Sequence, residues 1–202
     1  MCDDWKYVVW SDESSTFVWR SNWVYIWIIP KEAYNLECLV PIVKHGGGSV
    51  TNWAAISWYS AGPIITLNGQ IAVSDYMDII GNQAHLLIQM LFPNSNAVFW
   101  DDSSFIHTAR SVLSWFEEHE DALQHLTWPA QWVDLIIFEP LLSVLESRVR
   151  SRFTPSSSLK QLEDVTHEEW YSIALETIRN LYESIPRRLQ PVLQTHSGQT
   201  LY

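Results

Sequence analysis

Three acidic residues stand where side chains from distant parts of the chain can meet. Asp12 and Asp102 each follow a short apolar run that is typical of a buried strand, and Glu139 opens a helix after a strand and a proline break. Two adjacent strand ends and a helix start can converge on one side of a sheet. Carboxylates gathered there repel one another unless a divalent cation lies among them, so the trio indicates a Mg²⁺ site.

The chemistry of such a site is phosphodiester cleavage. Two metal ions about 3.5–4 Å apart activate a nucleophile and stabilise the leaving oxygen. Acidic residues at strand ends are also common as solvated groups without a ligand. The spacing of Asp12, Asp102 and Glu139 by itself therefore leaves both interpretations open.

Apolar and β-branched runs predict the strands that carry these residues. The run at 7–10 places Asp12 at a strand terminus, and the run at 97–100 ends at Asp101 and Asp102. Alternation along that strand points Asp101 to the opposite face from Asp102. Further strands are predicted at 23–29, 49–58, 64–67 and 123–126, with a turn or flexible tip at 44–49.

Apolar residues at helical spacing predict the helices that follow and separate these strands. The expected helices span 74–92, 108–119 and about 138–153, and a last helical region runs from Ser158 to about Leu193. Ser74 and Asp75 are placed to cap the first of them. This order of elements indicates an α/β layer fold with a mixed sheet.

The composition bounds the class of protein. With 202 residues, 47% hydrophobic and 17% charged, the chain is expected to fold as one domain and not as a disordered, collagen-like or coiled-coil protein. No apolar run approaches the ~18 residues of a membrane span, and the first residues lack the pattern of a signal peptide. Two cysteines and no N-glycosylation motif give no sign of an oxidising compartment, so the cytosol or the nucleus is expected.

The formal net charge of −11 argues against a domain that works mainly by nonspecific attraction to phosphate. The basic residues gather near the C-terminus, and the local group is Arg148, Arg150, Arg152, Arg187 and Arg188. Two interpretations of this group stay open. It is either a solvated helical surface or a strip that holds a nucleic-acid backbone.

Four short motifs occur in order along the chain. They are Trp10-Ser-Asp-Glu-Ser14, Lys44-His-Gly-Gly-Gly-Ser-Val50 with Trp53-Ala-Ala-Ile56, Asp102 with His107-Thr108, and Asp134-Leu135 with Glu139. Together they resemble the DDE catalytic domain of mariner-type transposases of the Tc/mariner superfamily, from about residue 3 to the C-terminus. The last two carboxylates are separated by 36 residues, which is within the range of that family.

The resemblance implies a ribonuclease H-like α/β fold, with a core at 1–153 and a C-terminal helical extension at 154–202 packed on the same domain. It matches Asp12, Asp102 and Glu139 to the family's three catalytic acids, which would bind Mg²⁺ or Mn²⁺ at a two-metal site. The implied reaction is strand cleavage at transposon ends and joining to target DNA. The implied partner is DNA and not a membrane. The resemblance also implies a nuclear location and allows a homodimer.

His107 is the remaining residue that the resemblance singles out, because the family keeps a histidine close to its second aspartate. It is interpreted either as a residue that shapes the site beside Asp102 or as a satisfied structural histidine.

The sequence departs from the family pattern around the site. The second motif is usually Asp-Asn-x-Pro-x-His, and here Ser103 and Phe105 replace the Asn and the Pro. In the third motif Trp132, Val133 and Ile136 replace Ser, Pro and Asn. Loss of groups that orient metal ligands commonly costs about 10–100-fold in affinity or activity. The bulky side chains of Trp100, Phe105 and Trp132 are also expected to disfavour ionised carboxylates by desolvation, so we expect an impaired site.

Only 11 residues precede Asp12, whereas members of the family carry two helix-turn-helix units and a basic linker before the catalytic domain. A truncated copy is therefore expected. Two hypotheses follow: a metal-dependent endonuclease and strand-transferase domain of a DDE transposase, or a catalytically inactive transposase-derived module that binds DNA or protein.

Overall fold

The computed structural model describes residues 4–17, 48–69, 71–94, 97–126, 137–152 and 158–194. The predicted strand at 23–29, most of the turn at 44–49, and Trp132 and Asp134 lie outside these ranges. The described strands are β1 (Val8–Phe17), β2 (Ser49–Ser57), β3 (Ser60–Leu67), β4 (Ala97–Trp100) and β5 (Leu123–Leu126). The described helices are η1 (Asp4–Tyr7), α1 (Val73–Ile79), η3 (Ile80–Ala84), α2 (His85–Leu91), α3 (Arg110–Glu118), α4 (Phe138–Ser151), α5 (Leu159–Tyr171) and α6 (Leu175–Gln194).

The described strands form one mixed sheet in the order β3-β2-β1-β4-β5. The first three strands are antiparallel neighbours, while β4 lies parallel to β1 and β5 parallel to β4. This confirms the predicted α/β class with a mixed sheet. The short strands β4 and β5 have the predicted bounds, and β4 is a compact apolar run closed by polar residues.

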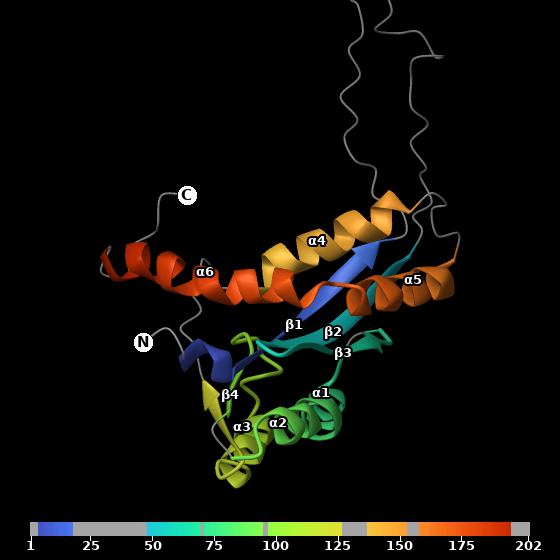
Figure 1. Ribbon diagram of the computed structural model, residues 1–202. Helices are drawn as coiled ribbons and strands as arrows, with labels where there is room; N and C mark the ends of the chain where they lie inside the picture. The colour runs from blue at the N-terminus through green and yellow to red at the C-terminus, as the bar shows by residue number, and fades with distance from the viewer. Residues whose placement is uncertain are drawn as a thin grey trace, which may run out of the picture.

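Helices cover both faces of the sheet, with α4, α5 and α6 on one side and α1, α2 and α3 on the other (Figure 1). Alternation along β1 divides the core accordingly. Trp10 packs in a buried cluster with Phe138 and Leu141 of α4, whereas Val9 packs in a second cluster with Tyr76 of α1. The sheet therefore lies between two separate hydrophobic layers.

The strand β1 is longer than predicted. Its parallel ladder with β4 ends at the pair Trp10 and Trp100, but its antiparallel ladder with β2 continues to Phe17. Asp12, paired with Ala54, therefore lies inside a strand and not at its terminus. The prediction was wrong because a polar sequence after an apolar run can still extend along a neighbouring strand when main-chain bonds pair it.

The predicted first helix is present but begins and runs differently. It starts at Val73, with Ala72 as the N-cap residue, and its path is interrupted by the π-helical turn η3. The Ser74 cap is not formed. Instead the Asp75 carboxylate accepts a 2.9 Å hydrogen bond from the Ala72 N–H, which is the role that an acidic residue at the third helical position takes in a capping box.

The last two helices are fastened to the sheet by buried polar contacts. The Trp170 indole N–H donates to the Gly62 carbonyl at 2.9 Å, and the Tyr182 hydroxyl donates to the Val8 carbonyl at 2.8 Å. Ser158 caps α5 as predicted, by accepting from the Gln161 N–H at 3.2 Å. No helix in the described ranges is long and apolar enough to cross a membrane.

Gly62 of β3 is placed where no larger side chain fits. A Cβ there would stand 2.7 Å from the Ala55 carbonyl oxygen and 2.8 Å from a Leu87 methyl. We expect Gly62→Ala to lower the free energy of unfolding by about 1–3 kcal/mol through overpacking. Gly81→Ala is the control, because a Cβ at Gly81 meets nothing within 4 Å and improves helix propensity by up to about 1 kcal/mol. Urea denaturation tests this, and equal effects of the two changes would contradict it.

Candidate metal centre

Asp12 lies two residues beyond the last parallel pair of β1 and β4, on the face that α4 covers. Its Oδ1 accepts a 2.8 Å hydrogen bond from the Glu13 N–H. Burial, together with the charges of Glu13 and Asp102, raises the pKa of Asp12 to about 7 against the lowering effect of that hydrogen bond. Asp102 is thus close enough to Asp12 for its charge to oppose the ionisation of Asp12.

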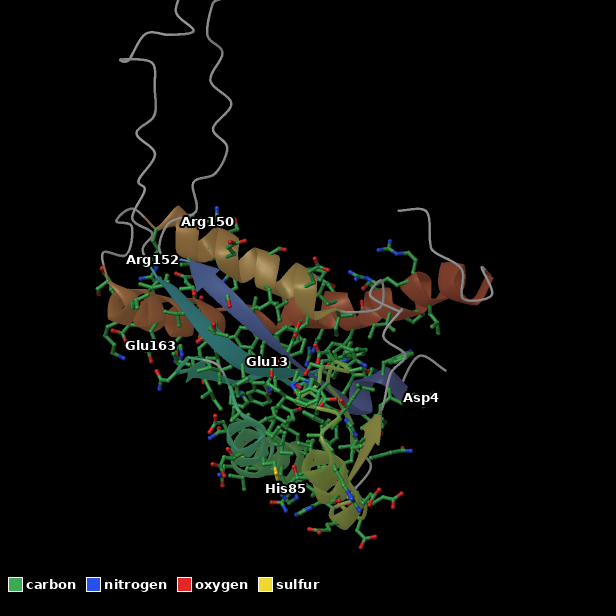
Figure 2. All side chains as sticks on the ribbon, turned by 180° about the vertical axis from the view of Figure 1, so that it is seen from behind. Asp4, Glu13, His85, Arg150, Arg152 and Glu163 are labelled. Atoms are coloured by element: carbon green, nitrogen blue, oxygen red, sulfur yellow. The ribbon has the colours of Figure 1, made fainter. Side chains whose placement is uncertain are left out.

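Asp102, in the loop after β4, is held by His107. The His107 Nδ1 stands 2.5 Å from Asp102 Oδ1, and its Nε2 stands 3.0 Å from Glu13 Oε1. One ligand atom each from Glu13, Asp102 and His107 lies within 4.8 Å of the others, so this group could hold a metal ion. Glu13 lies near the middle of the molecule, between the two helical layers (Figure 2).

The electrostatics of this group favour a protonated His107. Burial lowers the pKa of its imidazole, but hydrogen bonds to Asp102 and Glu13 and the nearby carboxylate charges outweigh burial and raise the pKa to about 10. The same hydrogen bond lowers the pKa of Asp102. In its protonated form His107 donates from both nitrogens and offers no lone pair to a metal.

Glu139 occupies the first turn of α4, as predicted, and its side chain is exposed. The neighbouring Phe138 and Leu141 pack in the same cluster as Trp10, so α4 lies over the face of β1 to which Asp12 belongs. Helix N-termini favour acidic side chains, and Pro140 is tolerated in the first turn. Glu139 does not belong to the group formed by Glu13, Asp102 and His107.

Asp101 points away from this face, as the alternation along β4 predicts. It is 3% exposed, and its carboxylate accepts from the Tyr76 hydroxyl at 2.5 Å and contacts His125 Nε2 at 2.9 Å. Sequence reasoning missed these partners and Glu13. The pairing of Phe99 with His125 would have placed His125 on the Asp101 face, but nothing in the sequence indicates that β5 pairs with β4 in this register.

Comparison with known proteins supplies the family. No protein-family profile matches the chain. The sequence is 32% identical over 204 residues to the transposase of the transposable element Tcb1 from Caenorhabditis briggsae, across 98% of this chain and 71% of that protein. The Tc1 transposase of Caenorhabditis elegans is 31% identical over 205 residues with the same coverage. The chain belongs to the Tc/mariner superfamily of transposases.

Solved structures agree with this mariner-type assignment at the level of the fold. A Mos1 transposase paired-end complex with the left transposon end superposes with a TM-score of 0.78 at 15% identity, over 98% of this chain and 57% of that one. The Mos1 catalytic domain with raltegravir and Mg gives a TM-score of 0.70 at 16% identity, over 98% of this chain and 86% of that one. The fold of this transposase domain is the ribonuclease H-like α/β fold.

The altered second motif of this transposase domain still orients its aspartate. The Ser104 N–H donates to Asp102 Oδ1 at 2.9 Å, and the Thr108 hydroxyl closes the turn on the Ser104 carbonyl at 2.9 Å. The family motif has an asparagine immediately after this aspartate. Here Ser103 stands at that position, and Asp102 accepts from a main-chain N–H, that of Ser104. Phe105 was expected to desolvate the carboxylates, but this was wrong because its side chain is 87% exposed.

The basic group near the C-terminus of the transposase domain is largely paired within the chain. Arg148 donates to the Ser172 carbonyl, Arg150 bonds Glu146 of the same helix, and Arg152 contacts two glutamates of α5. Arg150 and Arg152 lie together at the end of α4 (Figure 2). These contacts favour the interpretation of a solvated helical surface for the three arginines.

Proposed function

We propose that this domain cleaves a DNA strand and joins it to target DNA in a metal-dependent reaction, with Asp12, Asp102 and Glu139 as ligands of Mg²⁺ or Mn²⁺. The observation that carries the proposal is the placement of Asp12 and Asp102 just past the end of the β1–β4 ladder, where the charge of Asp102 contributes to the raised pKa of Asp12. The Tcb1 and Tc1 relatives are transposases, which supports it.

The donor set fits a divalent cation. Three carboxylates offer only hard oxygen donors, which Mg²⁺ and Mn²⁺ prefer. Burial of Asp12 beside other acids makes its ionisation costly, and a cation held between Asp12 and Asp102 would lower that cost. Mos1 structures that contain Mg or Mn support the choice of ion.

When bound, the two ions would supply an activated nucleophile and a stabilised leaving oxygen. The residues of the chain hold the carboxylates in place for this. His107 and the Ser104 N–H fix Asp102, and the Glu13 N–H fixes one oxygen of Asp12. The packing of α4 on β1 supports Glu139, in the first turn of that helix, as the third ligand.

The partners of the domain and the division of the chain follow from the same reaction. The substrates are transposon ends and target DNA, the site of action is the nucleus, and the domain acts as a homodimer. A left transposon end is present in the Mos1 paired-end complex, which supports DNA as the partner. Residues 1–153 form the catalytic core and 154–202 a helical extension packed on it, as α5 and α6 do in the shared cluster.

Thermal denaturation with Mn²⁺ or Mg²⁺ tests the metal site directly. A ligand at 100 times its Kd stabilises the folded chain by about 2.7 kcal/mol, which raises Tm by roughly 5–10 °C for a chain of this size. We expect this rise in the unmutated chain and not in the double variant Asp12→Asn, Asp102→Asn. Equal melting curves of the two proteins with either ion would overturn the proposed metal site.

A further inference from the structure

A second buried cluster lies behind the candidate metal centre and takes no part in the proposed reaction. Its centre is Asp101, whose two carboxylate oxygens are each occupied, Oδ2 by the Tyr76 hydroxyl at 2.5 Å and Oδ1 by His125 Nε2 at 2.9 Å. A carboxylate that is 3% exposed is costly unless such partners satisfy it. Three elements, α1, β4 and β5, are therefore fixed to one another through this side chain.

The Tyr76 side chain connects this cluster to the metal centre. Its ring lies against the His107 imidazole with centroids 4.2 Å apart, while its hydroxyl is held by Asp101. Burial and the Asp101 charge raise the pKa of Tyr76 well above its usual value, so the hydroxyl remains a donor. On the far side, the His125 ring is stacked on Phe116 with centroids 3.8 Å apart and an angle of 7°.

His107 holds Asp102 together with the Ser104 N–H. Its two ring nitrogens contact Asp102 and Glu13, so a tilt of the imidazole moves both carboxylates. The only ring contact of His107 within the described residues is Tyr76. A change in the hydrogen bond between Tyr76 and Asp101 is therefore transmitted to Asp102 through one tilted ring pair.

We propose that Asp101, Tyr76 and His125 are positioning residues for the metal centre, which set the plane of His107 and through it the direction of the Asp102 carboxylate. This rests on the proposed function, since the effect on metal requires Asp102 to be a ligand. The effect on His107 itself does not require a metal.

Tyr76→Phe is the sharpest test, because it removes one hydroxyl and keeps the ring. Tyr182→Phe is the matched control. The Tyr182 hydroxyl is equally buried and bonds the Val8 and Ile56 carbonyls in the cluster on the other face of the sheet. The two variants should have a similarly lowered free energy of unfolding. A difference between them at the metal centre therefore cannot come from a general loss of stability. Asp101→Asn is a second variant that keeps the shape of the side chain.

Two readouts are measured on the folded chain: the Kd for Mn²⁺ by calorimetry, and the nitrogen resonances of the histidine side chains by NMR without metal. His107→Gln identifies the His107 signals. For Tyr76→Phe and Asp101→Asn we expect an about tenfold weaker Kd and shifted His107 resonances, in line with the loss of an outer partner of a metal ligand. For Tyr182→Phe we expect both readouts to stay as in the unmutated chain.

The outcomes separate this inference from the proposed function. Unchanged His107 resonances in Tyr76→Phe overturn the inference, and so do equal changes in Tyr182→Phe. If the unmutated chain binds no Mn²⁺, the proposed metal site fails, while shifted His107 resonances in Tyr76→Phe alone still support the positioning of His107.

Discussion

Replacing Glu139 by glutamine is expected to lower the rate of DNA strand cleavage by on the order of 10³-fold, whereas Glu13→Gln should lower it by about tenfold. A metal ion lowers the barrier by several kcal/mol, and about 4 kcal/mol corresponds to a factor of 10³. Glu139 lies in the first turn of α4, a helix that packs on β1, and we propose its exposed carboxylate as a metal ligand. Glu13 is already engaged by His107 at 3.0 Å.

The measurement is nicking of a supercoiled plasmid, with Mn²⁺ varied at fixed pH and folding checked by circular dichroism. Glu146→Gln is a control on the same helix, since Glu146 bonds Arg150 at the surface. If Glu13→Gln abolishes cleavage and Glu139→Gln does not, the metal is held by Glu13, Asp102 and His107 instead of the proposed trio.

The stability of the metal-free protein is expected to fall as the pH rises from 8 to 9.5. His107 has a pKa raised from 6.5 to about 10 in the folded chain, so the folded state keeps a proton there that the unfolded state has lost. This stabilisation is fully present below pH 6.5 and is lost as the pH rises through 10. The slope is about 1.4 kcal/mol per pH unit, which gives about 2 kcal/mol over this window.

The window is chosen to exclude Asp12. Its pKa is raised from 3.8 to about 7, so Asp12 also makes the free energy of unfolding fall as the pH rises. That fall is complete by about pH 8. Urea denaturation in the presence of a chelator measures the effect, with His107→Gln as the comparison. The variant should lose less stability over the window than the unmutated chain, and parallel curves would show that His107 is not held as an ion pair.

The sequence predicted the elements well where a single run of residues determines them. The strands β4 and β5, the start of α4 and the Ser158 cap each depend on neighbouring residues, and all four are as predicted. The extent of β1 was not predicted, because it depends on main-chain pairing with a strand more than thirty residues away. Local pattern carries no information on such a partner.

The candidate site shows the same division. Asp12, Asp102 and Glu139 were chosen from position and resemblance, and their assignment as the metal ligands stays a prediction. The burial that raises the pKa of Asp12 agrees with the expected desolvation, but the pKa of Asp102 falls because His107 is bonded to it. The bond between His107 and Asp102 depends on the turn that joins them. The changes at Ser103 and Phe105 in this motif do not indicate the shape of that turn.

The placement of β1 between two hydrophobic layers protects this strand from local opening. A central strand packed on both faces belongs to the part of a protein whose amides exchange most slowly with solvent, while helix ends and loops open more often. Asp12 is carried by that strand, and Asp102 lies two residues past the end of its parallel neighbour β4. We therefore expect the position of Asp12 to persist through local opening of the outer helices, so that this part of the proposed site is preorganised and less ordering entropy is lost when a substrate arrives.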